Sequence, residues 1–162
     1  MVLRSFAAFD NQAFTVAAGS PSGTPGSPII NNSSTPINQI FEFNAGFPYQ
    51  TVTLNDTSST PDIFNDDDES NHVITSGGTL VSSGTEVESE SYHFLRQIDS
   101  SGNQFGPTIT ITVFSQNGQT SNIWGMASDT ELIPGAQYQK TSGSNNGDSL
   151  YDTFVPCFTT GA

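Results

Sequence analysis

The residues with the clearest chemical potential are carboxylates gathered in one short stretch, DIFNDDDES. Its oxygen-bearing side chains are Asp62, Asn65, Asp66, Asp67, Asp68 and Glu69. Carboxylates this close in sequence repel one another unless water or a cation separates them, and Ca²⁺ prefers oxygen ligands of this kind. The stretch lacks the glycine and the final glutamate of an EF-hand loop. We interpret it as an acidic loop that is either solvated or a Ca²⁺ site.

A second set of carboxylates, Glu86, Glu88 and Glu90, recurs at every other residue. In a strand these side chains share one face at a spacing of roughly 6.5–7 Å, which glycoside hydrolysis can use. Catalytic pairs usually come from different strands, however, and an exposed acidic stripe commonly protects a sheet edge. We expect an edge-protecting stripe and a chain without enzymatic activity.

Other chemical signals are weak. His72 and His93 have no partner at the spacing of zinc ligands, and the chain has no nucleophile elbow, phosphate-binding loop or dinucleotide fingerprint. Aromatic side chains can stack on sugars, and the candidates are Trp124, Tyr92, Tyr138 and Tyr151. Because the chain has few leucines, we expect most of these rings to lie in the core. A carbohydrate-binding interpretation therefore centres on Trp124.

Composition excludes several partners. The 162 residues carry a net charge of −13 with only three Lys and Arg, so nothing neutralises the phosphates of a nucleic acid. An anionic membrane surface would repel the chain, and no apolar run approaches the roughly 18 residues of a membrane span. A single cysteine forms no intrachain disulfide and does not decide the compartment. Asp10, Asn11 and Gln12 interrupt any signal-peptide core, although the low-Lys, Ser/Thr/Asn/Gly-rich composition is similar to that of exported bacterial surface proteins.

The elements that must position these side chains are predicted to be strands. Thr and Ile or Val alternate over 108–113, and Asn117-Gly118 predicts a type I′ hairpin turn into a return strand at 120–127. Further strands are expected at 40–43, 49–55, 72–74, 79–81, 86–98, 136–141 and 150–155. Eight to ten short strands at regular spacing predict an all-β fold, an antiparallel β-sandwich or jelly roll.

We expect three segments along the chain. Residues 1–36 are a flexible N-terminal segment, with a short strand near 13–17 and a Pro/Gly/Ser-rich linker at 19–36. Residues 37–156 form the β-sandwich, and residues 157–162 begin a further segment that does not belong to it. A tethered strand can join its own sheet or add to the edge of a neighbouring copy, which would make the protein a homo-oligomer.

The last six residues bear most directly on function. The segment Cys157-Phe158-Thr159-Thr160-Gly161 resembles the opening of a Hint (hedgehog/intein) autoprocessing domain. The preceding region also looks like the amino-terminal domain found before Hint domains in marine alphaproteobacterial proteins. Ala162 departs from the family, which usually has Thr there.

The resemblance implies a specific reaction. Cys157 would attack the Pro156 carbonyl and form a thioester, and water, a thiol or an amine would then release or transfer the upstream domain. In the family the groups that polarise this carbonyl lie downstream of the cysteine. The 162 residues would therefore be an inactive passenger.

Together these observations predict a non-enzymatic, exported β domain with a structural or adhesive role at the bacterial cell surface or outside it, with Ca²⁺ as a candidate ligand. One alternative is a subunit that self-assembles into a filament or surface layer by N-terminal strand addition. Another is a carbohydrate-binding module that recognises a surface glycan.

Overall fold

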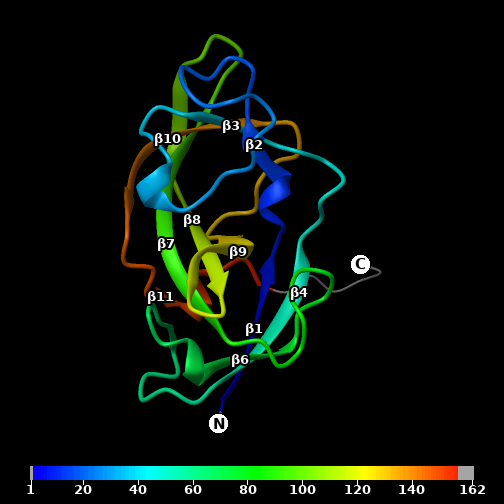
Figure 1. Ribbon diagram of the computed structural model, residues 1–162. Coiled ribbons are helices and arrows are strands. Elements are labelled where there is room, and N and C mark those ends of the chain that lie inside the picture. The colour runs from blue at the N-terminus through cyan, green and yellow to red at the C-terminus, as the bar shows by residue number, and fades with distance from the viewer. Residues whose placement is uncertain (1, 157–162) are drawn as a thin grey trace.

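The computed structural model describes residues 2–156, which form strands joined by turns and loops (Figure 1). The strands are β1 (Val2–Ala8), β2 (Phe14–Val16), β3 (Ile40–Phe43), β4 (Gln50–Asp56), β5 (Ile63–Phe64), β6 (His72–Ser76), β7 (Val87–Ile98), β8 (Gln104–Gln116), β9 (Gln119–Ser128), β10 (Gln137–Ser144) and β11 (Ser149–Leu150). The helices of this range are the 3-10 turns η1 (Asn11–Ala13), η2 (Asn32–Ser34), η3 (Glu69–Asn71) and η4 (Tyr151–Thr153). None of them is long and apolar enough to cross a membrane.

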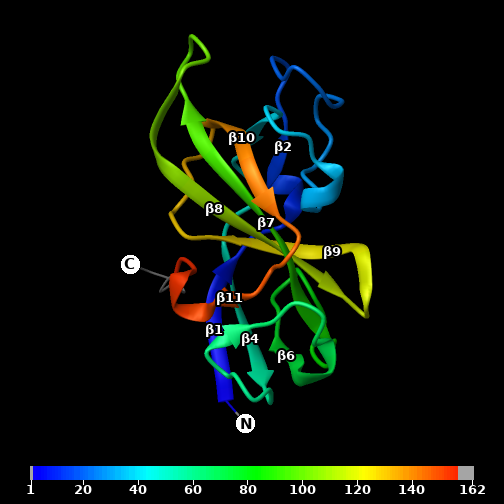
Figure 2. The same cartoon turned by 90° about the vertical axis from the view of Figure 1, so that its left-hand side faces the viewer.

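The strands form three sheets, and within each sheet every pair of neighbouring strands is antiparallel. The largest sheet has the order β2-β3-β10-β7-β8-β9, a second has the order β1-β4-β6, and β11 pairs with β5 (Figure 2). The prediction of an all-β, antiparallel, sandwich-like fold is confirmed.

The predicted central hairpin is present as β8 and β9. The alternation along β8 sends Ile109, Ile111 and Val113 into the core, where each is at most 6% exposed. Asn117 and Gly118 have φ values of 57° and 68°, the positive values that a type I′ turn requires at both central positions.

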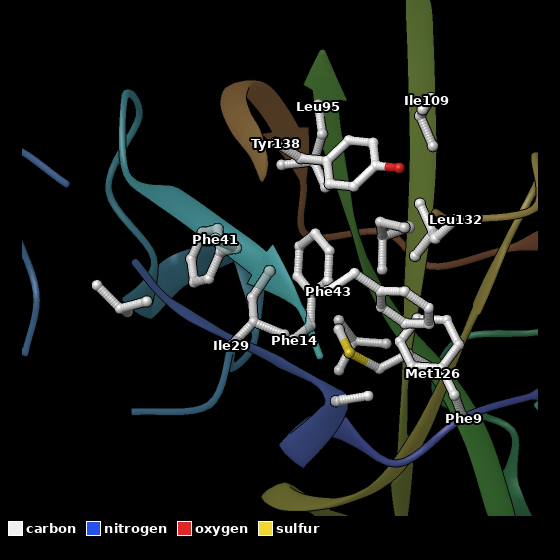
Figure 3. Close-up of a cluster of buried hydrophobic side chains, with 14 residues drawn as sticks. Phe9, Phe14, Ile29, Phe41, Phe43, Leu95, Ile109, Met126, Leu132 and Tyr138 are labelled. Carbon is white, nitrogen blue, oxygen red and sulfur yellow. The ribbon is translucent and has the colours of Figure 1, made fainter. Parts of the chain in front are cut away.

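Two clusters of buried side chains hold the sheets together. The first, shown in Figure 3, packs against one face of the six-stranded sheet and includes Phe14 and Phe41, whose stacked rings have centroids 5.5 Å apart. The second joins the three-stranded sheet to β8 and β9 and is centred on Phe6, whose ring centroid lies 5.0 Å from that of Phe154 and 5.5 Å from that of Phe114. Aromatic rings thus provide much of the core of a chain that has few leucines.

The N-terminal segment is not the flexible arm that the sequence suggested. All seven residues of β1 pair with β4, from Val2 opposite Asp56 to Ala8 opposite Gln50. Phe6 belongs to the second cluster, and Phe9 belongs to the first. The segment is therefore part of the folded body, because its apolar side chains fill both clusters.

The Pro/Gly/Ser-rich stretch at 19–36 is likewise packed rather than a free linker. The Val16 N–H donates to the Ser27 carbonyl at 2.8 Å, and the Ile29 N–H donates to the Phe14 carbonyl at 2.8 Å. Ile29 is only 1% exposed. The stretch covers the outer edge of β2, where an open row of backbone groups would otherwise invite pairing with another chain.

Lys140 on β10 fixes the far end of the same stretch. This side chain is 2% exposed, and its Nζ donates to Asn32 Oδ1 and to the Thr35 carbonyl, both at 2.7 Å, and to the Asn32 carbonyl at 3.2 Å. All three acceptors are neutral, and burial lowers the pKa of Lys140 to about 8.

Two predicted strands are wrong. Residues 79–81 form a turn in which the Leu80 N–H donates to the Gly77 carbonyl at 3.0 Å. Residues 150–155 contain only the end of β11 and then η4, because the Tyr151 ring turns into the second cluster and its hydroxyl bonds to Asp56.

Candidate metal centre

The acidic loop between β5 and β6 folds back onto the start of β7. The Ser89 N–H donates to the Asn65 carbonyl at 3.1 Å, and the Asp67 N–H donates to Glu88 Oε2 at 2.6 Å. Asp67 has a φ of 55°, a left-handed conformation that aspartate tolerates better than most residues. These contacts bring carboxylates from the loop beside a carboxylate from the strand.

Three of these carboxylates converge. One oxygen each from Asp66, Asp67 and Glu88 lies within 4.8 Å of the others, the one such grouping of His, Cys, Asp and Glu among residues 2–156. Glu88 is 2% exposed, Asp66 is half-buried and Asp67 is exposed. The Ser115 hydroxyl lies 3.2 Å from Glu88 Oε1 and 2.9 Å from Glu90 Oε2, so a fourth carboxylate borders the cluster.

The electrostatics of this cluster disfavour full ionisation. The pKa of Glu88 is raised to about 8, mainly by burial. The negative charges of Glu90 and Glu69 raise it further, whereas the hydrogen bond from the Asp67 N–H lowers it. Burial and the charges of Asp67 and Glu90 raise the pKa of Asp66 to about 6. A divalent cation would offset this repulsion, and carboxylate oxygens are the ligands that Ca²⁺ prefers.

The other residues of the predicted metal set are placed elsewhere. Asp62 pairs with Arg4 at 2.5 Å, and its side chain is 82% exposed. Asn65 Oδ1 accepts from the Thr60 hydroxyl at 3.3 Å, and Asp68 Oδ1 accepts from Asn71 Nδ2 at 2.8 Å. Glu69 lies on η3, close enough to raise the pKa of Glu88 but outside the three-carboxylate group.

The acidic stripe at the start of β7 is not the exposed, edge-protecting stripe that its spacing suggested. Glu86 is exposed, Glu88 is buried and Glu90 is half-buried. The difference arises because the acidic loop covers this part of β7, and because a bulge between Ser89 and Ser91 interrupts the alternation. The sequence pattern therefore identified Glu88 as one member of an acidic stripe. It did not indicate that Glu88 lies beside Asp66 and Asp67.

Both histidines are fully buried. His72 is fully buried, with Nε2 3.3 Å from Asp56 Oδ2 and Nδ1 2.6 Å from the Asp68 carbonyl oxygen. The Tyr151 hydroxyl donates to the same Asp56 oxygen at 2.8 Å. His93 is also buried, and burial together with the charge of Lys140 lowers its pKa to about 3, which keeps the ring neutral.

Trp124 does not present a ring to a sugar. It is 4% exposed, it stacks on Phe114 with ring centroids 5.1 Å apart, and its Nε1 donates to the Ser115 carbonyl at 3.1 Å. Tyr138 and Tyr151 are buried as well, so of the four aromatic candidates only Tyr92 is partly open. The prediction of a sugar-stacking role for Trp124 is wrong because the ring belongs to the second cluster.

The predicted cleavage junction lies at the end of the described range. The Val155 N–H donates to the Ser128 carbonyl at 2.8 Å and the Ala7 N–H donates to the Val155 carbonyl at 3.0 Å, whereas Pro156 is exposed. Cys157 lies outside the described residues. Comparison of the chain with known protein families, with curated proteins and with solved structures found no match.

Proposed function

We propose that the chain is a non-enzymatic structural domain whose acidic loop is held against β7 by Ca²⁺. The observation that carries the proposal is the convergence of Asp66, Asp67 and Glu88 from two separate segments onto one space, with oxygens within 4.8 Å of one another. An ion bound there would link the loop to the sheet. Backbone oxygens and water would complete the six to eight ligands that Ca²⁺ takes.

The setting we propose is outside the cell, at the bacterial surface or beyond it, in a structural or adhesive role. A net charge of −13 with three basic residues keeps copies of the chain apart and soluble. A site with few and partly exposed carboxylates suits the weak Ca²⁺ affinity of extracellular modules, on the order of 10⁻⁴–10⁻³ M. Both features support this setting.

Calcium is expected to stabilise the chain through Glu88. At about 10 mM Ca²⁺, which is above the affinity range of such sites, we expect the free energy of unfolding to rise by about 1.4–2.7 kcal/mol. In Glu88→Gln, which lacks one ionised ligand, most of this increase should be lost. Thermal and urea unfolding with and without Ca²⁺ measure the effect.

Glu86→Gln is the matched control, because Glu86 is an exposed glutamate just before β7 and lies outside the three-carboxylate group. It should keep the full Ca²⁺-dependent increase. The site would be refuted by equal increases in the Glu88→Gln and unsubstituted chains, or by no increase in either.

The passenger role is a separate part of the proposal, and it depends on the resemblance of 157–161 to a Hint opening. In a gene product that continues past Ala162 into such a domain, we expect a fragment ending at Pro156 to accumulate. Cys157→Ala should abolish that fragment, because the thioester cannot form without the thiolate nucleophile. Intact-mass spectrometry measures both products, and an uncleaved chain with Cys157 in place would remove the passenger role without affecting the Ca²⁺ site.

A further inference from the structure

A groove of about 340 Å³ lies between strands β7 and β8 and the C-terminal segment 148–154. Leu95 on β7 points into the first hydrophobic cluster, so Tyr92 and Phe94, three residues and one residue before it, point to the opposite face of the sheet. Tyr92 pairs with Thr112 and Phe94 with Thr110 on that face. Figures 1 and 2 both show the red C-terminal segment beside these strands.

The floor of the groove is an aromatic strip. Tyr92 and Phe94 are both half-buried, and their ring centroids are 6.1 Å apart with a tilt of 51°. Because they occupy alternate positions of one strand, the rings lie side by side rather than facing each other across the groove. The strip therefore offers two neighbouring ring surfaces that are inclined to one another.

Polar and apolar side chains share the rest of the lining. Asp129 and Asp148 line the groove together with the hydroxyl-bearing Thr110 and the exposed, apolar Leu150. Both carboxylates are held in place, since Asp129 Oδ1 accepts from the Thr110 N–H at 3.0 Å and Asp148 Oδ1 accepts from the Asp66 N–H at 2.6 Å. No Lys, Arg or His is among the described residues that line the groove.

We infer that this groove binds an uncharged saccharide. A pyranose has a C–H face that packs on an aromatic strip, and an edge of hydroxyls that donate to carboxylates in strong, charge-assisted hydrogen bonds. Acidic saccharides are excluded, because Asp129, Asp148 and the net charge of −13 repel them. A cation is the competing ligand class, because a ring face beside carboxylates also suits a positive charge.

The inference stands apart from the Ca²⁺ proposal, because none of the three converging carboxylates lines the groove. Asp148 is the one link between the two sites, through the hydrogen bond from the Asp66 N–H. The probes are a set of uncharged oligosaccharides with gluco, galacto, manno and xylo configuration, and a matched set of uronic-acid oligosaccharides. Binding is screened on an array, and the best ligand is titrated by calorimetry with and without Ca²⁺. We expect at least one uncharged oligosaccharide to bind and no uronic-acid oligosaccharide to bind.

Two variants test the placement of the site. Tyr92→Ala should weaken binding about tenfold or more, equivalent to about 1.4 kcal/mol, and Asp129→Asn should weaken it as well. Phe105→Ala is the matched control, because Phe105 is an aromatic residue of β8 that is 44% exposed and lies outside the groove. It should leave the affinity unchanged. Circular dichroism confirms that each variant is folded before its affinity is compared.

The inference is overturned if no uncharged oligosaccharide binds, or if folded Tyr92→Ala binds as tightly as the unsubstituted chain. Tetramethylammonium is the probe for the competing ligand class. If it binds in a Tyr92-dependent manner while the saccharides do not, the groove is a cation site and the saccharide inference fails.

Discussion

Deletion of residues 1–18 is expected to leave the chain unable to fold cooperatively. The deletion removes β1, β2 and the side chains of Phe6, Phe9 and Phe14, none more than 1% exposed. Truncation of one buried phenylalanine to alanine typically costs about 3–5 kcal/mol. The loss of three buried phenylalanines, together with the pairing of β1 to β4, should therefore cost as much as or more than the total free energy of unfolding of a typical domain, roughly 5–15 kcal/mol.

Thermal unfolding followed by circular dichroism measures this effect, and single substitutions give its scale. Phe6→Ala alone should lower the free energy of unfolding by about 3–5 kcal/mol. Leu3→Ala is the matched control, because Leu3 lies on the same strand and is 58% exposed, so its effect should stay within about 0.5 kcal/mol. A sharp, cooperative transition in the deleted chain would show that the N-terminal segment is dispensable.

This prediction bears on self-assembly by strand addition. On that interpretation the deleted chain stays folded and only loses the ability to assemble. In the structure the end of β1 has partners on both sides, since Ala7 pairs with Thr51 of β4 and its N–H bonds to the Val155 carbonyl. Phe9, just after β1, pairs with Met126. Donation of this strand to a neighbour would therefore require a copy to give up part of both hydrophobic clusters.

Without a divalent cation, stability is expected to fall as the pH rises from about 4.5 to about 8. The pKa of Glu88 rises from its ordinary value of 4.5 to about 8 on folding, and that of Asp66 rises from 3.8 to about 6. Between the two values of each group the folded chain holds more protons than the unfolded chain. This contribution to stability is complete below the unfolded pKa and is lost as the pH passes the folded pKa.

The expected loss is about 2 kcal/mol. Each pKa unit corresponds to about 1.4 kcal/mol, and we reduce the sum strongly because Asp66 is only half-buried and water screens its charge. Urea unfolding at pH 5, 6, 7 and 8 in the presence of a chelator measures the slope. Ca²⁺ should flatten it, because the ion takes the place of the proton at the carboxylates.

Glu88→Gln serves as the control for the slope, since an amide cannot titrate. This variant should be less sensitive to pH and, in chelator at pH 8, at least as stable as the unsubstituted chain. The same slope in both proteins would assign the pH dependence to the general repulsion of a chain with a net charge of −13. The raised pKa of Glu88 would then have no measurable consequence.

The all-β character of the chain and its central hairpin could be predicted from the residues alone. The Thr and Ile alternation of 108–113 and the Asn117-Gly118 turn act over neighbouring residues, so their consequences follow from local geometry. The strand at 86–98 was also predictable, because its residues show no helical spacing of apolar side chains and the structure has β7 at Val87–Ile98.

Which polar residues are buried, and which segments close the fold, depends on contacts between segments far apart in the sequence. Glu88 lies 21 residues after Asp67 in the sequence, yet its Oε2 accepts a hydrogen bond from the Asp67 N–H. Asp66 converges on the same space. The stretch 19–36 has the composition of a linker and yet covers β2, and Trp124 lies in the core although its type also suits a ligand site. Local patterns report the preference of a backbone segment, whereas burial depends on which distant segments pack over it, and that is set by the chain as a whole.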